Sequence, residues 1–397
     1  MKGGDAVVVT GMGAVASLGL CLDEIWEKLL AGQKSMDSIT LFQTDGCRCR
    51  HGAQVPLPVA DRNQRRMSRA SRLVVKAADE ALAQSGLSSD DKKDLPISVS
   101  TTGGAMEWGE AFLRGVLTAR RSRRLSYVAG YQPQQQVLDM QKFLGLEGPY
   151  TIFANACASG ATAIGHAYDF IRSGAVSRVL AGGYEALTEL IFVGFDCLQA
   201  LSPDTCKPFD LERNGLMLGE GAAFFVLEKE SVALQRGAKI LGNIWGYGHA
   251  TDLHHLTQPS PDGMALIQAI NEAFRVAGTT PDSIAYLNAH GTGTPANDGM
   301  EAEVYAEVFG SSLSRLRLSS TKGAMGHTLG AAGAIEAVMA LRASQLGKPP
   351  PQVGGGKPLP LVASSLVQPG TTIPVGSHVM TTNLGFGGSN AALILSA

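Results

Sequence analysis

Short apolar runs alternate with longer amphipathic segments along the chain. A short run rich in β-branched residues is typical of a buried strand, and apolar residues spaced three and four apart are typical of a helix that packs on a sheet. The helix pattern that ends at Ser85 stops before Gly86, which suits a left-handed C-cap. In the first part of the chain we predict strands at residues 6–10, 97–100, 150–154, 179–181 and 222–227, and helices at 22–31, 68–85 and 159–173.

The same succession of patterns starts again at about residue 240. Because strands and helices alternate throughout, the fold class is α/β. The proline-rich segment 348–360 is interpreted as a connecting loop. In this second part we predict strands at residues 240–247, 284–288, 379–383 and 391–395, another ending at residue 320, and helices at 264–277, 298–308 and 331–345.

Two segments share a layout, which favours an internal duplication. Residues 151–160 and 285–293 each contain an apolar strand, then Asn-Ala, then a reactive residue and a glycine. We interpret them as equivalent parts of a repeat of roughly 200 residues, although so short a match also arises by chance. The chain is therefore divided into two halves, residues 1–239 and 240–397.

Composition narrows the class of protein. The chain has 397 residues, and its 17% of charged residues is below the roughly 25% of a typical globular protein. Much of its surface is therefore expected to be buried, in a core or in a subunit interface. A net charge of −2 gives no reason to expect nucleic acid or an anionic membrane as a partner. No apolar run reaches the ~20 residues of a membrane-spanning helix, and the N-terminus has no signal-peptide layout.

The six cysteines are scattered along the chain. Cys47 and Cys49 are closer together than the usual pair of zinc ligands, so no metal site is expected. Free cysteines of this kind suggest a reduced, cytoplasmic protein in which most of them are small core residues.

Cys157 is the best candidate for a nucleophile. It lies between the predicted strand 150–154 and the predicted helix that follows. A helix N-terminus lowers the pKa of a thiol and offers N–H groups to an oxyanion. A buried structural cysteine is the alternative interpretation. Because Cys157 lies between a strand and a helix, the two interpretations are about equally supported.

Two histidines follow strands in the second part of the chain. His290 and His327 each lie in a glycine-rich loop, where a substrate can approach closely. A single histidine of this kind is often only a turn residue. Because ligands bind at strand ends in α/β proteins, Cys157, His290 and His327 together predict one catalytic site.

Further motifs occur in a fixed order, and with them the chain resembles a known family. It is similar, nearly end to end, to the type II β-ketoacyl-acyl-carrier-protein synthases of the thiolase superfamily. The resemblance implies a thiolase-like five-layered αβαβα fold made of two similar halves, usually as a dimer. The motifs are Val9–Gly13, Asn155–Gly160, Lys207–Asp210 with Leu218–Gly221, His290–Pro295, Lys322–His327 and Asn383–Asn390.

The resemblance also implies a reaction. Cys157 would take an acyl group from the phosphopantetheine of an acyl carrier protein, and the enzyme would hold no tightly bound cofactor of its own. His290 and His327 would assist the decarboxylation of a malonyl carrier and stabilise the enolate, which attacks the acyl thioester. The backbone N–H groups of Cys157 and Phe386 would hold the developing oxyanion.

Other residues receive supporting roles from the same resemblance. These are an ion pair that orders the histidine loop (Lys322 and Glu336), carboxylates behind the site (Asp298 and Glu301), hydrogen bonds to the pantetheine arm (Thr292 and Thr294) and an aromatic gate (Phe386).

Arginines cluster at positions 62, 65, 66, 69 and 72, and again at 120, 121, 123 and 124. Such a cluster is often only a solvated face. Carrier proteins are acidic, however, and positive patches steer acidic partners. We expect Arg65, Arg66 and Arg69 to form part of a docking surface for the carrier protein.

Several alternatives remain open. Asn214 and Leu216 stand where the family more usually has aspartate and phenylalanine. A specialised polyketide or polyene ketosynthase, paired with a chain-length-factor-like subunit, is therefore an alternative to a homodimeric synthase of fatty-acid type. A non-catalytic subunit that binds carrier protein is another, although Cys157 and both histidines argue against it.

Nucleotide binding is not expected. Gly11 and Gly13 follow a strand and fit the start of a dinucleotide fingerprint. No acidic residue is suitably placed at the end of a following strand, as that fingerprint requires.

Overall fold

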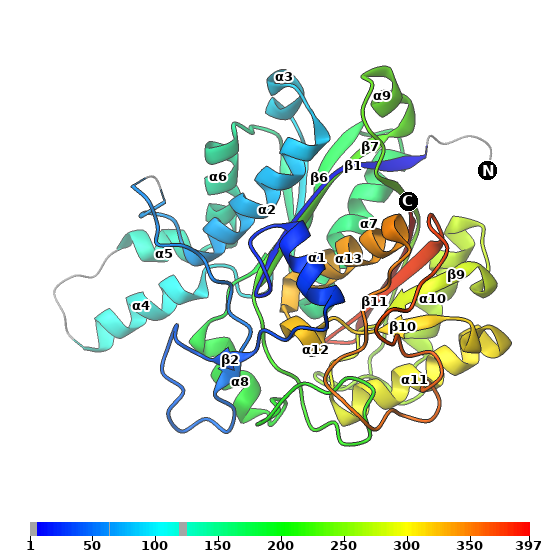
Figure 1. The fold of residues 1–397 in the computed structure, drawn as a ribbon. Helices are drawn as coiled ribbons and strands as arrows, with labels where there is room; N and C mark the ends of the chain where they lie inside the picture. The colour runs from blue at the N-terminus through cyan, green and yellow to red at the C-terminus, as the bar shows by residue number, and fades with distance from the viewer. Residues whose placement is uncertain (1–5, 63, 119–124) are drawn as a thin grey trace.

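One mixed sheet forms the centre of the molecule (Figure 1). The computed structural model describes residues 6–62, 64–118 and 125–397. Within these residues the sheet has ten strands in the order β10-β9-β11-β12-β8-β1-β7-β6-β4-β5, and β2 and β3 form a separate pair. The strands are β1 (Val7–Ala16), β2 (Asp37–Ser38), β3 (His51–Gly52), β4 (Ile97–Ser100), β5 (Tyr150–Phe153), β6 (Arg178–Glu185), β7 (Gly221–Lys229), β8 (Gly242–Thr251), β9 (Ile284–Asn288), β10 (Arg317–Ser319), β11 (His378–Gly385) and β12 (Ser389–Ser396).

Helices cover both faces of the strands. The α-helices are α1 (Leu22–Leu30), α2 (Arg69–Ser85), α3 (Ser89–Lys93), α4 (Met106–Leu117), α5 (Leu125–Tyr131), α6 (Pro133–Leu144), α7 (Ser159–Arg172), α8 (Glu189–Cys197), α9 (Glu230–Gln235), α10 (Met264–Ala277), α11 (Pro295–Phe309), α12 (Lys322–Met325) and α13 (Ala332–Leu346). Short 3-10 helices are η1 (Ala156–Ala158), η2 (Pro281–Ser283), η3 (Gly310–Ser314) and η4 (Leu329–Ala331).

The two halves of the sheet have the same topology. From its edge inward, the first half runs β5-β4-β6-β7-β1 and the second runs β10-β9-β11-β12-β8. In each half the three outer strands are parallel, and the two inner ones join antiparallel. The halves meet where Val7–Val9 pairs antiparallel with Gly242–Ile244. This repeat confirms the prediction of two similar halves; the boundary between residues 239 and 240 falls between α9 and β8 and stays a prediction.

The elements stack in five layers. In Figure 1, α7 and α13 lie between the two groups of strands. Their apolar residues form one buried cluster with side chains from both halves of the sheet. A second cluster joins α2 and α6 to the outer face of the first half, and a third joins α10 and α11 to the outer face of the second. The predicted αβαβα fold is therefore confirmed.

The proposed equivalence of residues 151–160 with 285–293 is wrong. In the strand order β5 corresponds to β10, and β9 corresponds to β4. The Cys157 turn is thus the counterpart of the turn before α13, not of the His290 loop. The two segments look alike because any strand that ends sharply in a tight loop favours small residues and glycine.

Gly11 and Gly13 serve packing. The first strand was expected to end at Gly11, but β1 continues to Ala16. A Cβ atom on Gly11 would lie 2.0 Å from the carbonyl oxygen of Ala81, and one on Gly13 would lie 2.4 Å from that of Ala77. Glycine is required at both positions because α2 crosses this strand closely, which explains the fingerprint-like spacing without a nucleotide.

Local elements otherwise follow the sequence closely. The bounds predicted for β4, β9 and α10 agree with the structure residue by residue. Ser68 caps α2 by accepting a hydrogen bond from Ser71 N–H, and Gly86 ends it with a φ of +63°. In the part of the chain that the structure describes, no helix is long and apolar enough to cross a membrane.

Candidate active site

Cys157 lies on a tight turn between β5 and α7. The turn, η1, begins at Ala156, whose φ is +54°, a conformation that non-glycine residues rarely adopt. The Ser159 hydroxyl closes it by accepting a hydrogen bond from Asn155 N–H (2.8 Å) and donating one to Ala156 C=O (2.6 Å). The position between strand and helix is as the sequence predicts, and the Cys157 side chain is buried.

The prediction of a lowered thiol pKa is wrong. Burial raises the pKa of Cys157 to about 12, although the nearby Lys322 charge and the Phe386 backbone N–H lower it. The thiol is therefore not ionised in advance. Its proton must leave as the sulfur reacts, which makes the neighbouring imidazoles important.

The His290 loop is held from behind by two buried carboxylates. Glu301 accepts hydrogen bonds from the backbone N–H groups of His290 (2.9 Å) and Gly291 (2.7 Å). Asp298 accepts hydrogen bonds from the backbone N–H groups of Thr292 (3.0 Å) and Gly293 (3.0 Å). Burial raises the pKa of Glu301 to about 7. Both carboxylates therefore fix the loop backbone rather than face the cavity, which fits the supporting role predicted for them.

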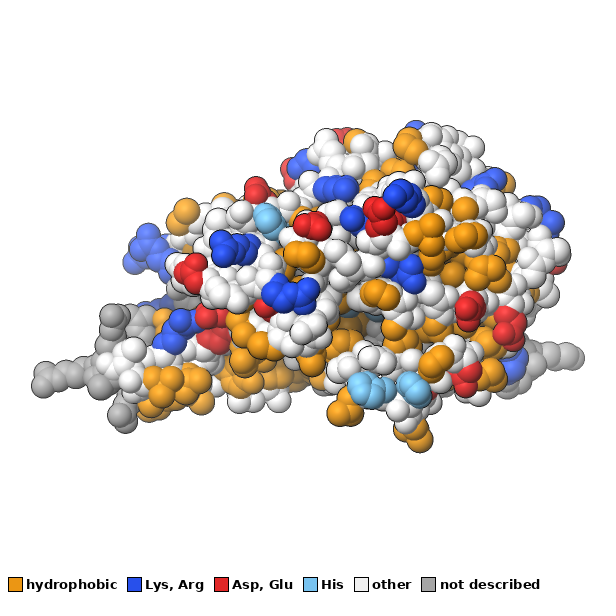
Figure 2. Space-filling model, turned by 90° about the horizontal axis from the view of Figure 1, so that it is seen from below, with side chains coloured by type: hydrophobic (Ala, Val, Ile, Leu, Met, Phe, Trp, Pro, Cys, Tyr) orange, Lys and Arg blue, Asp and Glu red, His pale blue; other side chains and the backbone are white. Residues whose placement is uncertain are grey.

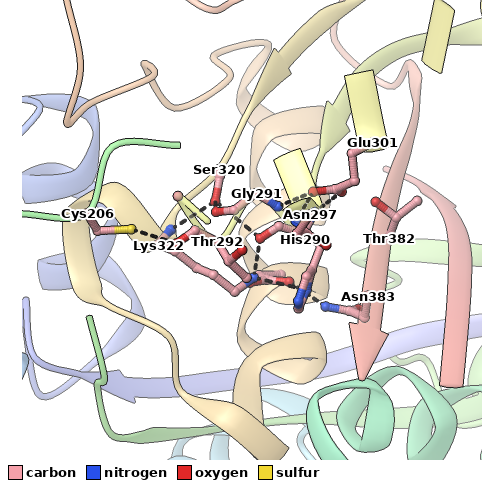
Figure 3. Close-up of polar contacts among 12 residues, drawn as sticks. Cys206, His290, Gly291, Thr292, Asn297, Glu301, Ser320, Lys322, Thr382 and Asn383 are labelled. Atoms are coloured by element: carbon pink, nitrogen blue, oxygen red, sulfur yellow. Dashed lines mark hydrogen bonds and ion pairs between the residues drawn. The ribbon is translucent and has the colours of Figure 1, made fainter. Parts of the chain in front are cut away.

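A buried lysine lies against His290. Lys322 Nζ is 2.6 Å from the His290 carbonyl oxygen, 3.4 Å from its Nδ1 and 2.5 Å from a Glu336 carboxylate oxygen. Asn383 donates to the other oxygen of Glu336 (2.6 Å). Figure 3 shows Lys322 and Ser320 approaching this loop from one side and Glu301 from the other. A cation beside Nδ1 favours the tautomer of His290 that carries its proton on Nε2.

His327 is positioned through its backbone. Its N–H donates to Met217 C=O (2.6 Å), and its C=O accepts from Gly219 N–H (2.9 Å). The imidazole Nδ1 is buried and has no hydrogen-bond partner among the described residues. The two imidazole rings meet edge to face, with centroids 5.3 Å apart.

Both imidazoles are held neutral. Burial lowers the pKa of His290 well below its ordinary value, and the charge of Lys322 lowers it further. The same two causes lower the pKa of His327. A neutral imidazole can donate one hydrogen bond to a developing oxyanion and can accept a proton at the other nitrogen.

One cavity of about 290 Å³ brings the candidate residues together, lined by Cys157, His290, His327, Thr292, Thr294 and Phe386 among others. The Thr292 and Thr294 hydroxyls are 2.9 Å apart on its wall. A Cβ atom on Gly385 would lie 3.2 Å from Cys157 N, so the backbone that leads into Phe386 passes directly beside the nucleophile. The catalytic and binding roles of these residues stay predictions.

The sequence did not point to Phe195, which lies on α8 and also lines the cavity. Its ring stacks on that of Phe386, with centroids 5.4 Å apart and an interplanar angle of 16°. No local pattern signals this pair, because the two residues come from different halves. Asn297, which donates to Glu301 (2.7 Å), could have been found in the same motif as Asp298.

The arginines predicted to dock a carrier protein separate into two groups. Arg65 and Arg66 are exposed and line a surface cavity beside α4 to α6. Arg69 instead turns inward, where its guanidinium bonds the buried carboxylate of Glu220 (2.8 and 3.0 Å). Arginines 120, 121, 123 and 124 lie outside the described residues. Figure 2 shows lysine and arginine side chains in several separate groups on the face seen from below, with hydrophobic side chains exposed between them.

Comparison with known proteins identifies the class first. The fold is that of the thiolase-like condensing enzymes. Residues 4–233 match the family model "Beta-ketoacyl synthase, N-terminal domain", and residues 241–355 match "Beta-ketoacyl synthase, C-terminal domain". The chain belongs to the β-ketoacyl synthase family. It is thus an enzyme of the acyltransferase class, as predicted.

Individual relatives match this chain over nearly its whole length. A "3-oxoacyl-[acyl-carrier-protein] synthase 2" of Synechocystis sp. is 32% identical over 98% of this chain and 97% of the relative. A solved structure described as "The ishigamide ketosynthase/chain length factor" matches with a TM-score of 0.92 and 31% identity over 100% of both chains. A solved structure described as "AntDE:AntF (apo): type II PKS acyl-carrier protein in complex with its ketosynthase bound to the hexaketide" contains a chain that matches with a TM-score of 0.89. The identity is 26% over 100% of both chains.

Proposed function

We propose that this chain catalyses the decarboxylative Claisen condensation of a Cys157-bound acyl group with a malonyl group carried on acyl carrier protein. The observation that carries the proposal is the single cavity shared by Cys157, His290 and His327. The full-length likeness to 3-oxoacyl-[acyl-carrier-protein] synthases supports the same reaction and the same carrier. A location in the cytoplasm stays a prediction.

In the first half-reaction Cys157 sulfur attacks the carbonyl carbon of a carrier-bound acyl thioester. The new S–C bond forms, the carrier thiol leaves, and the Cys157 proton passes to it by way of a neutral imidazole. The Cys157 and Phe386 N–H groups are proposed to bind the oxyanion, because preorganised donors stabilise charge where it develops.

In the second half-reaction a malonyl carrier enters and loses CO2. The electron pair of the broken C–C bond forms an enolate, whose oxygen accepts hydrogen bonds from His290 and His327. The enolate carbon then attacks the acyl carbonyl, the C–S bond to Cys157 breaks, and the thiolate takes up a proton. The Nε2–H tautomer favoured by Lys322 leaves His290 ready to donate.

The decisive experiment separates the two half-reactions. Incubation with acyl-carrier protein and mass spectrometry should show an acyl adduct on Cys157 in the wild type and none in Cys157→Ala. This variant should lose condensation yet retain CO2 release from malonyl-carrier protein, whereas His290→Ala and His327→Ala should lose CO2 release. A wild-type chain that takes up no acyl group would favour the non-catalytic subunit instead.

A second candidate is the same condensation performed by a heterodimer with a chain-length-factor-like subunit. It is supported by the likeness to the ishigamide ketosynthase/chain length factor. Asn214 and Leu216, where the chain departs from the usual motif, both line the cavity. A homodimer predicts that the purified chain elongates acyl groups alone. The heterodimer predicts elongation only after the second subunit is added.

We further propose that Arg65 and Arg66 contribute to carrier-protein docking. The double variant Arg65→Glu with Arg66→Glu should raise KM for acyl-carrier protein about 10-fold at low salt, since charge reversal removes electrostatic steering. The effect should shrink at high salt. Acylation by a free acyl-pantetheine should not change, and Lys239→Glu, at an exposed position on another part of the surface, serves as the matched control. An unchanged KM would remove these arginines from the docking surface.

A further inference from the structure

The turn that follows His327 is held by residues of the first half of the chain. Glu185, the last residue of β6, accepts a hydrogen bond from Gly330 N–H (3.0 Å). Ser100, the last residue of β4, donates its hydroxyl to Gly330 C=O (2.8 Å). The N–H and the C=O of Gly330, three residues after His327, are therefore each bound by a side chain of the first half.

Glu185 is fully buried and also binds the loop after β4. It accepts hydrogen bonds from the N–H groups of Thr102 (2.8 Å) and Gly103 (2.8 Å) and from the Thr101 hydroxyl (3.2 Å). In its ionised form this carboxylate has acceptors for all of these donors, although burial raises the pKa of Glu185 to about 7. It therefore ties two loops from different halves to one fixed point.

The packing around Gly330 leaves no room for a side chain. A Cβ atom on Gly330 would lie 2.6 Å from Thr102 N, and one on Gly183 would lie 2.9 Å from Gly330 O. Leu329 has a φ of +47°, which non-glycine residues rarely adopt. The turn thus depends on contacts from outside to keep its shape.

The His327 ring has no comparable anchor of its own. Its buried Nδ1 lacks a hydrogen-bond partner among the described residues, whereas His290 Nδ1 has Lys322 within 3.4 Å. The position of the His327 imidazole therefore follows from the backbone on either side of it, where Met217 and Gly219 bind one side and Gly330 is the bound point on the other.

We propose that Glu185 is a positioning residue for His327, acting through the Gly330 peptide, with Ser100 as the second contact. Glu185 does not line the cavity, so its side chain is placed to position the histidine and not to touch a substrate. The kinetic part of this inference rests on the proposed function; the structural part does not.

The test compares Glu185→Gln with Glu80→Gln. Glu80 is a matched control, because its carboxylate also accepts two backbone N–H groups, of Ala14 (2.9 Å) and Leu22 (3.0 Å), but lies in the outer layer. Glu185→Gln should slow CO2 release from malonyl-carrier protein about 10- to 100-fold, as is common when a supporting contact of a catalytic group is lost. Acylation of Cys157, for which the proposed function needs one neutral imidazole, should change less than CO2 release, which needs both, and Glu80→Gln should alter neither rate.

A second readout does not need activity. In protein labelled at histidine, NMR signals of the His327 ring, identified by their loss in His327→Gln, should shift in Glu185→Gln and stay in place in Glu80→Gln. Unchanged His327 signals, or equal losses of acylation and decarboxylation, would overturn the proposal. If the wild type releases no CO2, the proposed function fails and the NMR comparison alone decides. If Glu185→Gln does not fold, Ser100→Ala makes the same test with a smaller shift.

Discussion

The turn that carries Cys157 and the turn that follows His327 occupy equivalent places in the two halves, yet only the first has a reactive side chain. The first turn, η1, follows the edge strand β5 directly, and the second, η4, comes after the edge strand β10 and the short helix α12. Each turn leads into a central helix, α7 or α13. Each begins at a non-glycine residue with positive φ, +54° at Ala156 and +47° at Leu329. The next residue is Cys157 in one turn and Gly330 in the other.

Each turn is completed by the opposite half. Gly385, at the end of β11, approaches Cys157 N, and Glu185, at the end of β6, binds Gly330 N–H. Cys157 and Gly330 thus occupy equivalent positions. The first is the candidate nucleophile, and the second joins the two halves through Glu185. The histidines differ in the same way, because Lys322 of its own half anchors His290 while the first half anchors His327. The topology that the two halves share places one turn where it carries the candidate nucleophile and the other where it supports a histidine.

The largest expected effect follows from removing the anchor of His290. Lys322→Met leaves the buried Glu336 carboxylate without its cation, so the free energy of unfolding should fall by about 3–5 kcal/mol. The double variant with Glu336→Gln should recover most of this loss in a urea titration, since no uncompensated charge remains. CO2 release should stay low in both, and His327 ring signals should move less than those of His290. Equal shifts of both rings would show that the two anchors are not independent.

A smaller effect tests whether the helices after the turns are equivalent. Gly160 of α7 and Gly333 of α13 each stand second in their helix, and a Cβ atom would lie 2.6 Å from Ala334 N in the first case and 2.4 Å from Ala161 N in the second. Gly160→Ala and Gly333→Ala should each lower the free energy of unfolding by about 1–3 kcal/mol, as overpacking forces the helices apart. Because both insert into one contact, the double variant should lose less than the sum. Unequal losses of unfolding free energy in the two single variants would show that the starts of the two helices are not equivalent.

The smallest effect concerns protonation. His290 and His327 have folded-state pKa values well below 6.5, with burial as the main cause. Below pH 6.5 the unfolded chain takes up protons on these rings and the folded chain does not. Each should therefore cost up to ~1.4 kcal/mol of stability per pH unit as the pH falls. Stability is retained above pH 6.5 and declines below it.

The measurement is the difference in unfolding free energy between wild type and His290→Gln, or His327→Gln, from pH 7.5 to 5.5. Subtraction cancels the opposite contribution of Glu185 and Glu301, whose pKa values burial raises to about 7. Both variants should show the same slope although the two rings are anchored differently. A difference that does not vary with pH would mean that the rings can take up protons in the folded state.

Most of the local structure could be predicted from the sequence, because the periods of strands and helices are written in neighbouring residues. The limits of β4, β9 and α10 needed nothing further. Contacts between segments that are far apart in the sequence could not be predicted in the same way. The strand β1 continues beyond Gly11 because residues 11–16 pair with β7, and nothing within residues 6–16 reveals that partner strand. Arg69 belongs to a cluster of arginines in the sequence, whereas in the structure it forms an ion pair with the buried Glu220.

For the site, the sequence by itself determined which residues carry the chemistry: Cys157 between a strand and a helix, and two histidines in glycine-rich loops. The tertiary structure decided which turns correspond, how each histidine is held, and that burial raises rather than lowers the pKa of the thiol. The reason is physical. Residue type and secondary structure depend on near neighbours, whereas burial, charge and backbone anchoring depend on which distant segments fold against one another.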